Sequence, residues 1–162
     1  MERKTKVHAE DGKQEIMITR EFDLPLELLF KAYEDPELVA QWMGTKVLKL
    51  ENKPHGSYQF ETSDPQGNVV FRSNGTIHEF CPNRKITRTF EMESLSAEAQ
   101  SPRLPVQLEF LEFDKLTDST SKLTMQVVYK STAARDQILK MPFAQGINRA
   151  HNHLQEIVSK LK

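Results

Sequence analysis

The fold is decided by the stretch PFAQGINRAHNHLQEIVSKLK, residues 142–162. Its apolar residues, with one histidine among them, step by three and four positions over about five helical turns. They are Phe143, Ile147, Ala150, His151, Leu154, Ile157, Val158 and Leu161. This spacing predicts an amphipathic helix, the longest of the chain. Pro142 lacks a backbone donor and disfavours helix at Met141, so residues 133–140 are expected to form a separate or kinked helical piece.

Residues 46–130, ahead of this helix, have the pattern of strands and turns. Turn signals stand at residues 53–56 (KPHG), 64–68 (DPQGN) and 81–84 (CPNR). Between them, apolar and polar residues alternate as in half-buried strands. The alternating sets are Leu48 and Leu50; Tyr58 and Phe60; Val69, Phe71 and Ile77; Ile86, Phe90 and Met92; Val106, Leu108 and Phe110; and Leu123, Met125, Val127 and Tyr129. The pair Phe110 and Leu111, followed by Phe113, predicts a bulge, and residues 94–105 are expected to be irregular.

The N-terminal quarter adds one strand and two short helices. A further strand is predicted over residues 14–22, followed by a helix over 26–33. Asp35, as an N-cap, begins a second short helix, which Gly44 ends.

This order of elements predicts one α+β domain. A chain of 162 residues has room for a single ordinary domain. An antiparallel sheet with one apolar face has to be covered, and only the C-terminal helix is long enough to cover it. We expect a curved antiparallel sheet of about seven strands wrapped around that helix, with residues 1–13 a flexible lead-in and residues 14–162 the single domain. The space between helix and sheet is either a ligand cavity or is filled by side chains, and both remain open.

Composition and charge exclude several classes of partner. Lys and Arg total 22 and Asp and Glu total 23, a net charge of −1, which gives no field that would gather nucleic acid or an anionic membrane. The apolar run near Leu24 is broken by Pro25 and Glu27 and is too short to span a membrane. The single cysteine, Cys81, fits a reducing compartment. We therefore expect a cytoplasmic protein with no cofactor and no metal.

Three segments resemble a known family: ITREFDLPLELLFKAYEDPELVAQWMG (18–44), GNVVFRSNGTIHEFCPNRKITRTF (67–90) and YKSTAARDQILKMPFAQGINRAHNHLQEIV (129–158). They are similar to the bacterial single-domain homologues of the activator of heat-shock protein 90 ATPase, in the SRPBCC (START, Bet v 1-like) superfamily. The resemblance covers residues 14–162 and implies the helix-grip (Bet v 1-like) fold, in agreement with the order of elements. It implies less about activity, because that superfamily includes lipid carriers, hormone receptors, polyketide cyclases and a co-chaperone domain.

Arg88 is the first candidate ligand-binding residue. It shares a strand face with Ile86, Phe90 and Met92, so its guanidinium is expected on the concave side of the sheet. There it would bind a ligand carboxylate or an internal Glu, because an unpaired buried charge is too costly to persist. The alternative is a place near the strand end, from which the side chain reaches water.

His151 is the second candidate, because it lies on the apolar stripe of the C-terminal helix. It is interpreted as a core or cavity-edge histidine with a satisfied ring nitrogen, or as a polar anchor for a ligand. His153 lies two residues further on and points to another side of the helix, so the two rings cannot chelate one metal. The rest of the predicted cavity lining is aromatic or aliphatic: Trp42, Phe60, Phe71, Phe90, Met125, Phe143 and Ile147.

Signals for catalysis are weak. His78 with Glu79, and Glu109 with Asp114, are acid–base couples by residue type only, and both are interpreted as solvated strand residues. Cys81 has no CxxC partner. No catalytic residue is assigned.

Three functions follow from these features. The main hypothesis is non-catalytic binding of a small hydrophobic or amphipathic ligand between sheet and C-terminal helix. The family resemblance alone implies the second, a co-chaperone-like domain that modulates an ATPase partner. The third is a cyclase- or hydrolase-type enzyme that uses Arg88 and His151 in the same cavity. The chain is expected to be a monomer or homodimer, with no nucleic-acid or membrane partner.

Overall fold

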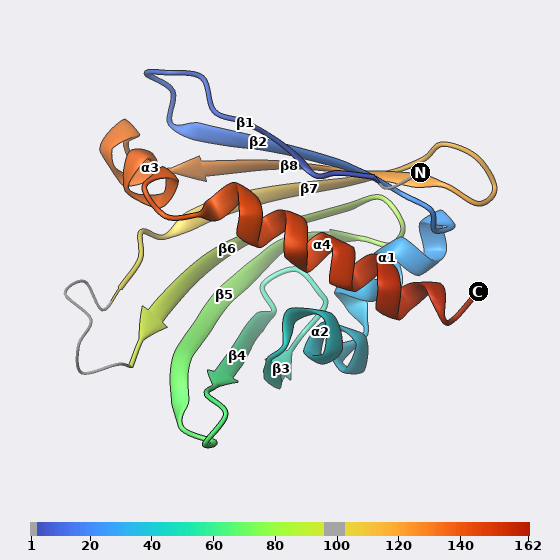
Figure 1. The fold of residues 1–162 in the computed structure, drawn as a ribbon, viewed down its shortest axis with the longest axis horizontal. Helices are drawn as coiled ribbons and strands as arrows, with labels where there is room; N and C mark the ends of the chain where they lie inside the picture. Colours follow the sequence, from blue (N-terminus) through green and yellow to red (C-terminus); the bar gives the residue numbers. More distant parts are fainter. Residues whose placement is uncertain (1–2, 96–102) are drawn as a thin grey trace.

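The computed structural model describes residues 3–95 and 103–162 (Figure 1). Within these residues one antiparallel sheet has the strand order β1-β2-β8-β7-β6-β5-β4-β3. Its strands are β1 (Lys6–His8), β2 (Glu15–Phe22), β3 (Lys46–Leu50), β4 (Ser57–Ser63), β5 (Val69–Cys81), β6 (Lys85–Ser94), β7 (Gln107–Lys115) and β8 (Ser121–Tyr129). The helices are α1 (Leu26–Glu34), α2 (Pro36–Met43), α3 (Thr132–Leu139) and α4 (Phe143–Ser159).

Local chemistry sets the helix ends where the sequence predicts them. The Asp35 carboxylate accepts a hydrogen bond from the backbone N–H of Glu37 at 2.9 Å, which caps α2. Gly44 ends α2 in the left-handed region, at φ 64°. α3 and α4 are separate helices, with Pro142 between them, which confirms the predicted break.

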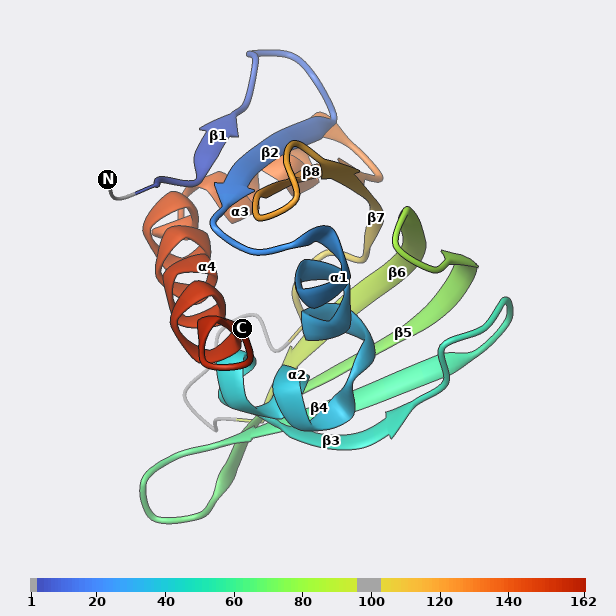
Figure 2. The same ribbon diagram turned by 90° about the vertical axis from the view of Figure 1, so that its right-hand side faces the viewer.

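The sheet curves around the helices. Figure 2, which looks nearly along α4, shows α1, α2 and α4 on the concave side of the sheet. The backbone of α4 lies closest to α2, α1 and β1. A curved antiparallel sheet with a long C-terminal helix on its concave side is the predicted helix-grip arrangement.

The described sheet has eight strands, where about seven were expected. The additional strand, β1, falls in the segment expected to be a flexible lead-in, and Val7 pairs with Ile18 of β2. A strand of three residues is too short to show the alternation on which the prediction depends. Thr5, just before β1, donates its backbone N–H to Asn148 Oδ1 of α4 at 2.9 Å, so this segment contacts both the sheet and the helix.

The predicted bulge at Phe110 and Leu111 is wrong. β7 pairs with β6 and with β8 without any shift of register. Register shifts occur instead in the pairings of β3 with β4, β4 with β5, and β5 with β6. The residues of β7 that share the concave face are Gln107, Glu109, Leu111 and Phe113, one position out of phase with the predicted set. Complete burial of Leu111 and near-complete burial of Phe113 require this phase.

The buried side chains form two apolar clusters. The larger cluster joins β2, β7 and β8 to α1, α3 and α4, with Phe30 and Leu154 among its members. The smaller cluster consists of Val39, Tyr58, Phe60 and Ile77, where α2 covers β4 and β5. Polar groups inside the fold are expected at the boundary between these two apolar clusters.

Two further points concern the limits of the described chain. Most of the segment 94–105, expected to be irregular, lies outside the described residues. Among the helices that the structure describes, none combines the length and apolar character needed to cross a bilayer.

Candidate functional site

An ion pair occupies the concave face of the sheet. Arg88 of β6 and Glu109 of β7 are directly opposite one another in the strand register. Arg88 Nε donates a hydrogen bond to Glu109 Oε1 at 2.8 Å, and the two residues are 8% and 5% exposed. The structure thus provides the internal glutamate that the sequence offered as one partner for Arg88.

Two polar side chains complete the carboxylate's surroundings. Gln107 Nε2 donates to Glu109 Oε2 at 2.6 Å. The Tyr129 hydroxyl of β8 donates to Gln107 Oε1 at 3.1 Å. Both oxygens of Glu109 are therefore hydrogen-bonded, and three adjacent strands contribute to one chain of polar groups.

The guanidinium of Arg88 lies between the two apolar clusters. Its Cζ is 6.0 Å from the ring centre of Tyr33, in the larger cluster, and 5.2 Å from that of Tyr58, in the smaller one. Burial is the largest single influence and would lower the pKa of Arg88, but the charge of Glu109, the hydrogen bond to it and the two nearby tyrosines together outweigh burial, so the pKa is raised. Burial raises the pKa of both tyrosines. Arg88 is therefore a permanent cation beside two neutral phenols.

Hydrogen-bonding capacity remains unused at this position. Among the described residues, Arg88 has one hydrogen-bond partner, Glu109, which its Nε contacts. Its two terminal nitrogens and the Tyr33 hydroxyl have none within the described chain. Tyr58, in contrast, donates its hydroxyl to the backbone carbonyl of Thr89 at 2.6 Å. A guanidinium carries five N–H donors, so most of those of Arg88 are available to another molecule.

The two ends of α4 differ in burial. Its fully buried residues, His151, Leu154 and Val158, all lie in the second half of the helix. Phe143 and Ile147, in the first half, are only half-buried. Phe90 and Met92, which share the face of β6 with Arg88, are half-buried too. The concave face is thus packed at one end of α4 and less covered at the other.

Two pockets lie near the start of β7, and none of their described lining residues comes from α4. One of about 450 Å³ lies between the segment that leads into β7 and α3, and Leu104, Val106 and Ala134 are among its lining residues. A smaller one of about 180 Å³ contacts Met92 and Leu104.

The other predicted lining residues fall into three groups. Trp42, Phe60 and Met125 are buried core residues, and Trp42 Nε1 donates to the Ala32 carbonyl at 2.7 Å. Phe90, Phe143 and Ile147 are half-buried. Phe71 is 39% exposed, at the far end of β5. A role in ligand binding remains a prediction for all of them.

His151 lies apart from Arg88. It is fully buried, with Nδ1 2.7 Å from the Thr5 hydroxyl and its ring edge-on to Phe22 at 5.6 Å. Burial, aided by the nearby charge of Arg20, lowers the pKa of His151 to about 3, so the ring is neutral. The Thr5 contact agrees with the interpretation as a core histidine with a satisfied ring nitrogen. The structure does not bring the two polar candidates into one cluster.

The remaining candidates for metal binding or acid–base chemistry make contacts that hold the fold together or lie in solvent. His153 Nδ1 lies 3.1 Å from the Trp42 carbonyl oxygen, a different partner from that of His151. In the part of the chain that the structure describes, no three potential metal ligands come together. His78, Glu79 and Asp114 are exposed, as expected for solvated strand residues.

The interpretation of Glu109 as a solvated strand residue is wrong. The sequence analysis placed Leu108 and Phe110 on the buried face and hence Glu109 on the outer one. Leu111 and Phe113 carried the missing signal, since they share the face of Glu109 and are the more deeply buried residues. Gln107, Tyr33 and Tyr58 were not predicted as site residues either, because their proximity to Arg88 depends on the packing of three separate elements.

Together, the curved antiparallel sheet and the long C-terminal helix on its concave side define the class of helix-grip proteins of the Bet v 1-like type. The profile of the family described as Activator of Hsp90 ATPase homolog 1-like protein matches residues 23–159, and the chain belongs to this family. This confirms the resemblance seen in the sequence.

Solved structures show the same fold at low sequence identity. A crystal structure of a protein from Mycobacterium smegmatis has a TM-score of 0.78 and 20% identity, and covers 94% of each chain. A solution structure from Arthrobacter aurescens has a TM-score of 0.82 and 15% identity, over 96% of this chain and 91% of that one. A Rhodobacter sphaeroides protein has a TM-score of 0.78 and 19% identity, over 97% and 99%. A search of curated proteins finds no match.

Proposed function

We propose that the protein binds a small hydrophobic or amphipathic molecule between the sheet and the first half of α4, without catalysis of its own. The observation that carries this proposal is the state of Arg88, a buried cation whose terminal nitrogens have no hydrogen-bond partner in the described chain. These nitrogens are not among the fully buried atoms that lack a partner, so they keep contact with solvent, and a polar group of a bound molecule would replace that water as their acceptor.

Charge balance limits the kind of polar group. Arg88 and Glu109 already neutralise one another. A ligand carboxylate would add a negative charge to a buried neutral pair and would be repelled by Glu109. A carbonyl, ether or hydroxyl oxygen would accept from Arg88 without that cost. We therefore propose a neutral polar group on the ligand, with the Tyr33 hydroxyl as a second donor.

The apolar part of the ligand has its own surface. Phe90, Phe143 and Ile147 are half-buried and lie on the concave face or on the first half of α4. Covering these side chains removes apolar surface from water, which favours binding in proportion to the area covered. The proposal therefore predicts that binding weakens when this space is filled.

The test is a fluorescence titration with Nile red, a neutral dye that brightens in apolar surroundings. We expect saturable binding to the wild-type protein, weakened about tenfold or more by Ile147→Trp, which corresponds to about 1.4 kcal/mol. Leu48→Trp, at an exposed apolar residue of β3, is the matched control and should bind as the wild type does.

Competition then tests the charge argument. Dodecanol should displace the dye at a lower concentration than dodecanoate does. Absence of saturable dye binding, or equal loss in the two tryptophan variants, would show that the proposal is wrong. Stronger competition by dodecanoate would leave the site in place and overturn the neutral-group argument alone.

The family description supports a second candidate, a co-chaperone-like interaction with an ATPase partner. Stimulation of the ATPase activity of the host's heat-shock protein 90 homologue by the purified protein would support it. An unchanged ATPase rate at saturating protein would end it.

A further inference from the structure

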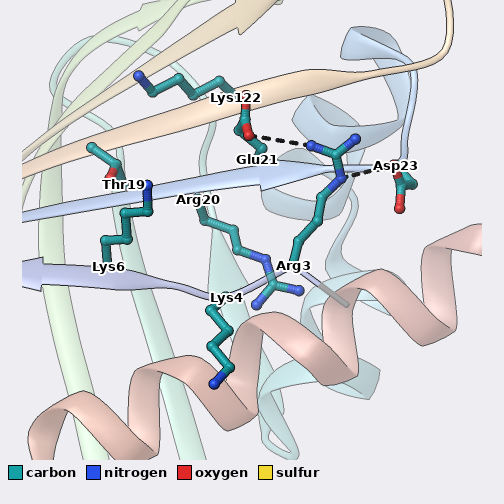
Figure 3. A pocket seen from close by; sticks show the side chains of 8 residues that line it. All are labelled: Arg3, Lys4, Lys6, Thr19, Arg20, Glu21, Asp23 and Lys122. Atoms are coloured by element: carbon teal, nitrogen blue, oxygen red, sulfur yellow. Dashed lines mark hydrogen bonds and ion pairs between the residues drawn. The ribbon is translucent and has the colours of Figure 1, made fainter. Parts of the chain in front are cut away.

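A pocket of about 580 Å³ is lined by residues of β1 and the segment just before it, of β2 and the residue that follows it, and of β8 (Figure 3). Five basic residues line it: Arg3, Lys4, Lys6, Arg20 and Lys122. These residues come from three neighbouring strands: Lys122 from β8, Arg20 from β2, and the others from β1 and the residues just before it.

The lining carries a clear excess of positive charge. Its acidic residues are Glu21 and Asp23, and both bind one residue, Arg3, whose Nε is 2.8 Å from Asp23 Oδ1 and whose Nη1 is 3.3 Å from Glu21 Oε2. Among the lining residues that the structure describes, five cations less two anions leave a net +3, in a protein whose total is −1. Within the described chain, Lys4, Lys6 and Lys122 make no ion pair.

One cation of the pocket has a fixed position. Arg20 is 3% exposed, and its Nη1 donates to Asn152 Oδ1 at 2.8 Å and to Asn148 Oδ1 at 3.3 Å, both on α4. Its Cζ also lies 5.2 Å from the ring centre of Phe22. In Figure 3 the Arg20 guanidinium lies near the base of the Arg3 and Lys4 side chains, whose charged ends point toward Asp23 and toward α4, respectively. The pocket therefore combines a rigid guanidinium with exposed lysines that are free to move toward an anion.

We propose that this pocket binds a small multivalent anion, with phosphate or a phosphate ester as the chemical class. A pocket of this size is in the range of small-molecule sites, and a net +3 matches an anion of two or three charges. Clustered like charges repel one another, so an anion that neutralises them is attracted from solution. The Thr19 hydroxyl, also in the lining, adds a neutral hydrogen-bond donor.

The geometry favours a compact anion over a polyanion. The basic residues named here line one pocket of a chain whose total charge is −1. A nucleic acid would need positive charge along its whole path. This site and the one beside Arg88 are lined by different residues, so each can be tested without the other.

The test is an NMR titration of the ¹⁵N-labelled protein with pyrophosphate at constant ionic strength, following the Arg20 side-chain Nε–H and the backbone amides of residues 19–23. We expect saturable shifts at these signals. The triple variant Lys4→Gln, Lys6→Gln, Lys122→Gln should weaken binding about tenfold, the combined effect of three exposed ion pairs.

A variant with the same change of net charge is the control. Lys31→Gln, Lys53→Gln, Lys140→Gln alters three exposed lysines that do not line this pocket and should bind pyrophosphate as the wild type does. Titrations with inorganic phosphate and with glycerol phosphate separate a free anion from an ester. No saturable shift, shifts at other residues, or equal loss in both triple variants would overturn the proposal, and none of these results bears on Nile red binding.

Discussion

Replacing Glu109 by glutamine should destabilise the protein strongly, since it removes the only ionic partner of Arg88 within the described residues. Glutamine keeps the size of the side chain but not its charge, and its single amide oxygen can accept from only one of the two donors that Glu109 binds, Arg88 Nε and Gln107 Nε2. The Arg88 and Glu109 side chains are 10% and 6% exposed, so solvent screens them little. Leaving one charge of a buried pair unbalanced costs about 3 kcal/mol or more. For a domain of this size, that loss lowers Tm by about 6 to 12 °C.

The measurement is urea unfolding of the wild type, Glu109→Gln, Arg88→Met and the double variant. The double variant should be more stable than the sum of the two single losses predicts, because no buried charge remains unpaired. Glu61→Gln is the matched control: it removes the same charge from the more exposed pair with Arg72, and should cost less than about 1 kcal/mol. Equal losses for Glu109→Gln and Glu61→Gln, or strict additivity in the cycle, would refute the claim that the pair is buried.

Four further substitutions test other parts of the fold. The pKa of His151 is about 3 in the folded protein against an ordinary 6.5. The stability that the protein gains by keeping this ring neutral is therefore complete above pH 6.5 and is lost as the pH falls toward 3. The free energy of unfolding should drop by about 2 kcal/mol between pH 7.5 and 5 on this account, and a His151→Asn variant whose urea melts decline just as steeply would contradict it. Gly75→Ala should lower the free energy of unfolding by about 1 to 3 kcal/mol, because the new methyl group overlaps the Thr89 carbonyl oxygen and the Tyr58 ring. Gly146→Ala, at an open helical position, should raise it by about 0.5 to 1 kcal/mol. Thermal melts in which Gly75→Ala is the more stable of the two variants would contradict both expectations. Asp35→Ala should lower the free energy of unfolding by about 1 kcal/mol, because it removes the N-cap hydrogen bond of α2. The same melts measure this loss, and an unchanged Tm would show that the cap does not stabilise the helix.

Local signals explain why most of the fold was predictable. The helix that begins at Phe143 repeats its apolar residues at the helical period, and Asp35 and Gly44 mark the ends of α2 with side-chain and backbone chemistry that acts within a few residues. Period and caps are properties of neighbouring residues, so one sequence is enough to recognise them. β1 could not be predicted in this way, because a strand of three residues is too short to show an alternating pattern. Its place in the sheet depends on pairing with β2.

The candidate site was predictable only in part. The phase of β6 placed Arg88 on the concave face, and the structure agrees. The partner could not be identified because β7 has apolar residues at both phases: Leu108 and Phe110 on one face, Leu111 and Phe113 on the other. Which face turns inward depends on pairing with β6 and β8, and hence on contacts far apart in the sequence.

The position of β2 in the sheet has a consequence for folding. β2 pairs along its whole length with β8, so that Ile16 meets Val127, and Thr5 contacts His151 across 146 positions. During synthesis, the apolar residues of β2 therefore stay unpaired until β8 has left the ribosome. These residues are Ile16, Ile18 and Phe22. Contacts this distant slow folding and prolong the exposure of an apolar strand to other chains and to chaperones. β2 can therefore reach its final place in the sheet only after β8 has been made.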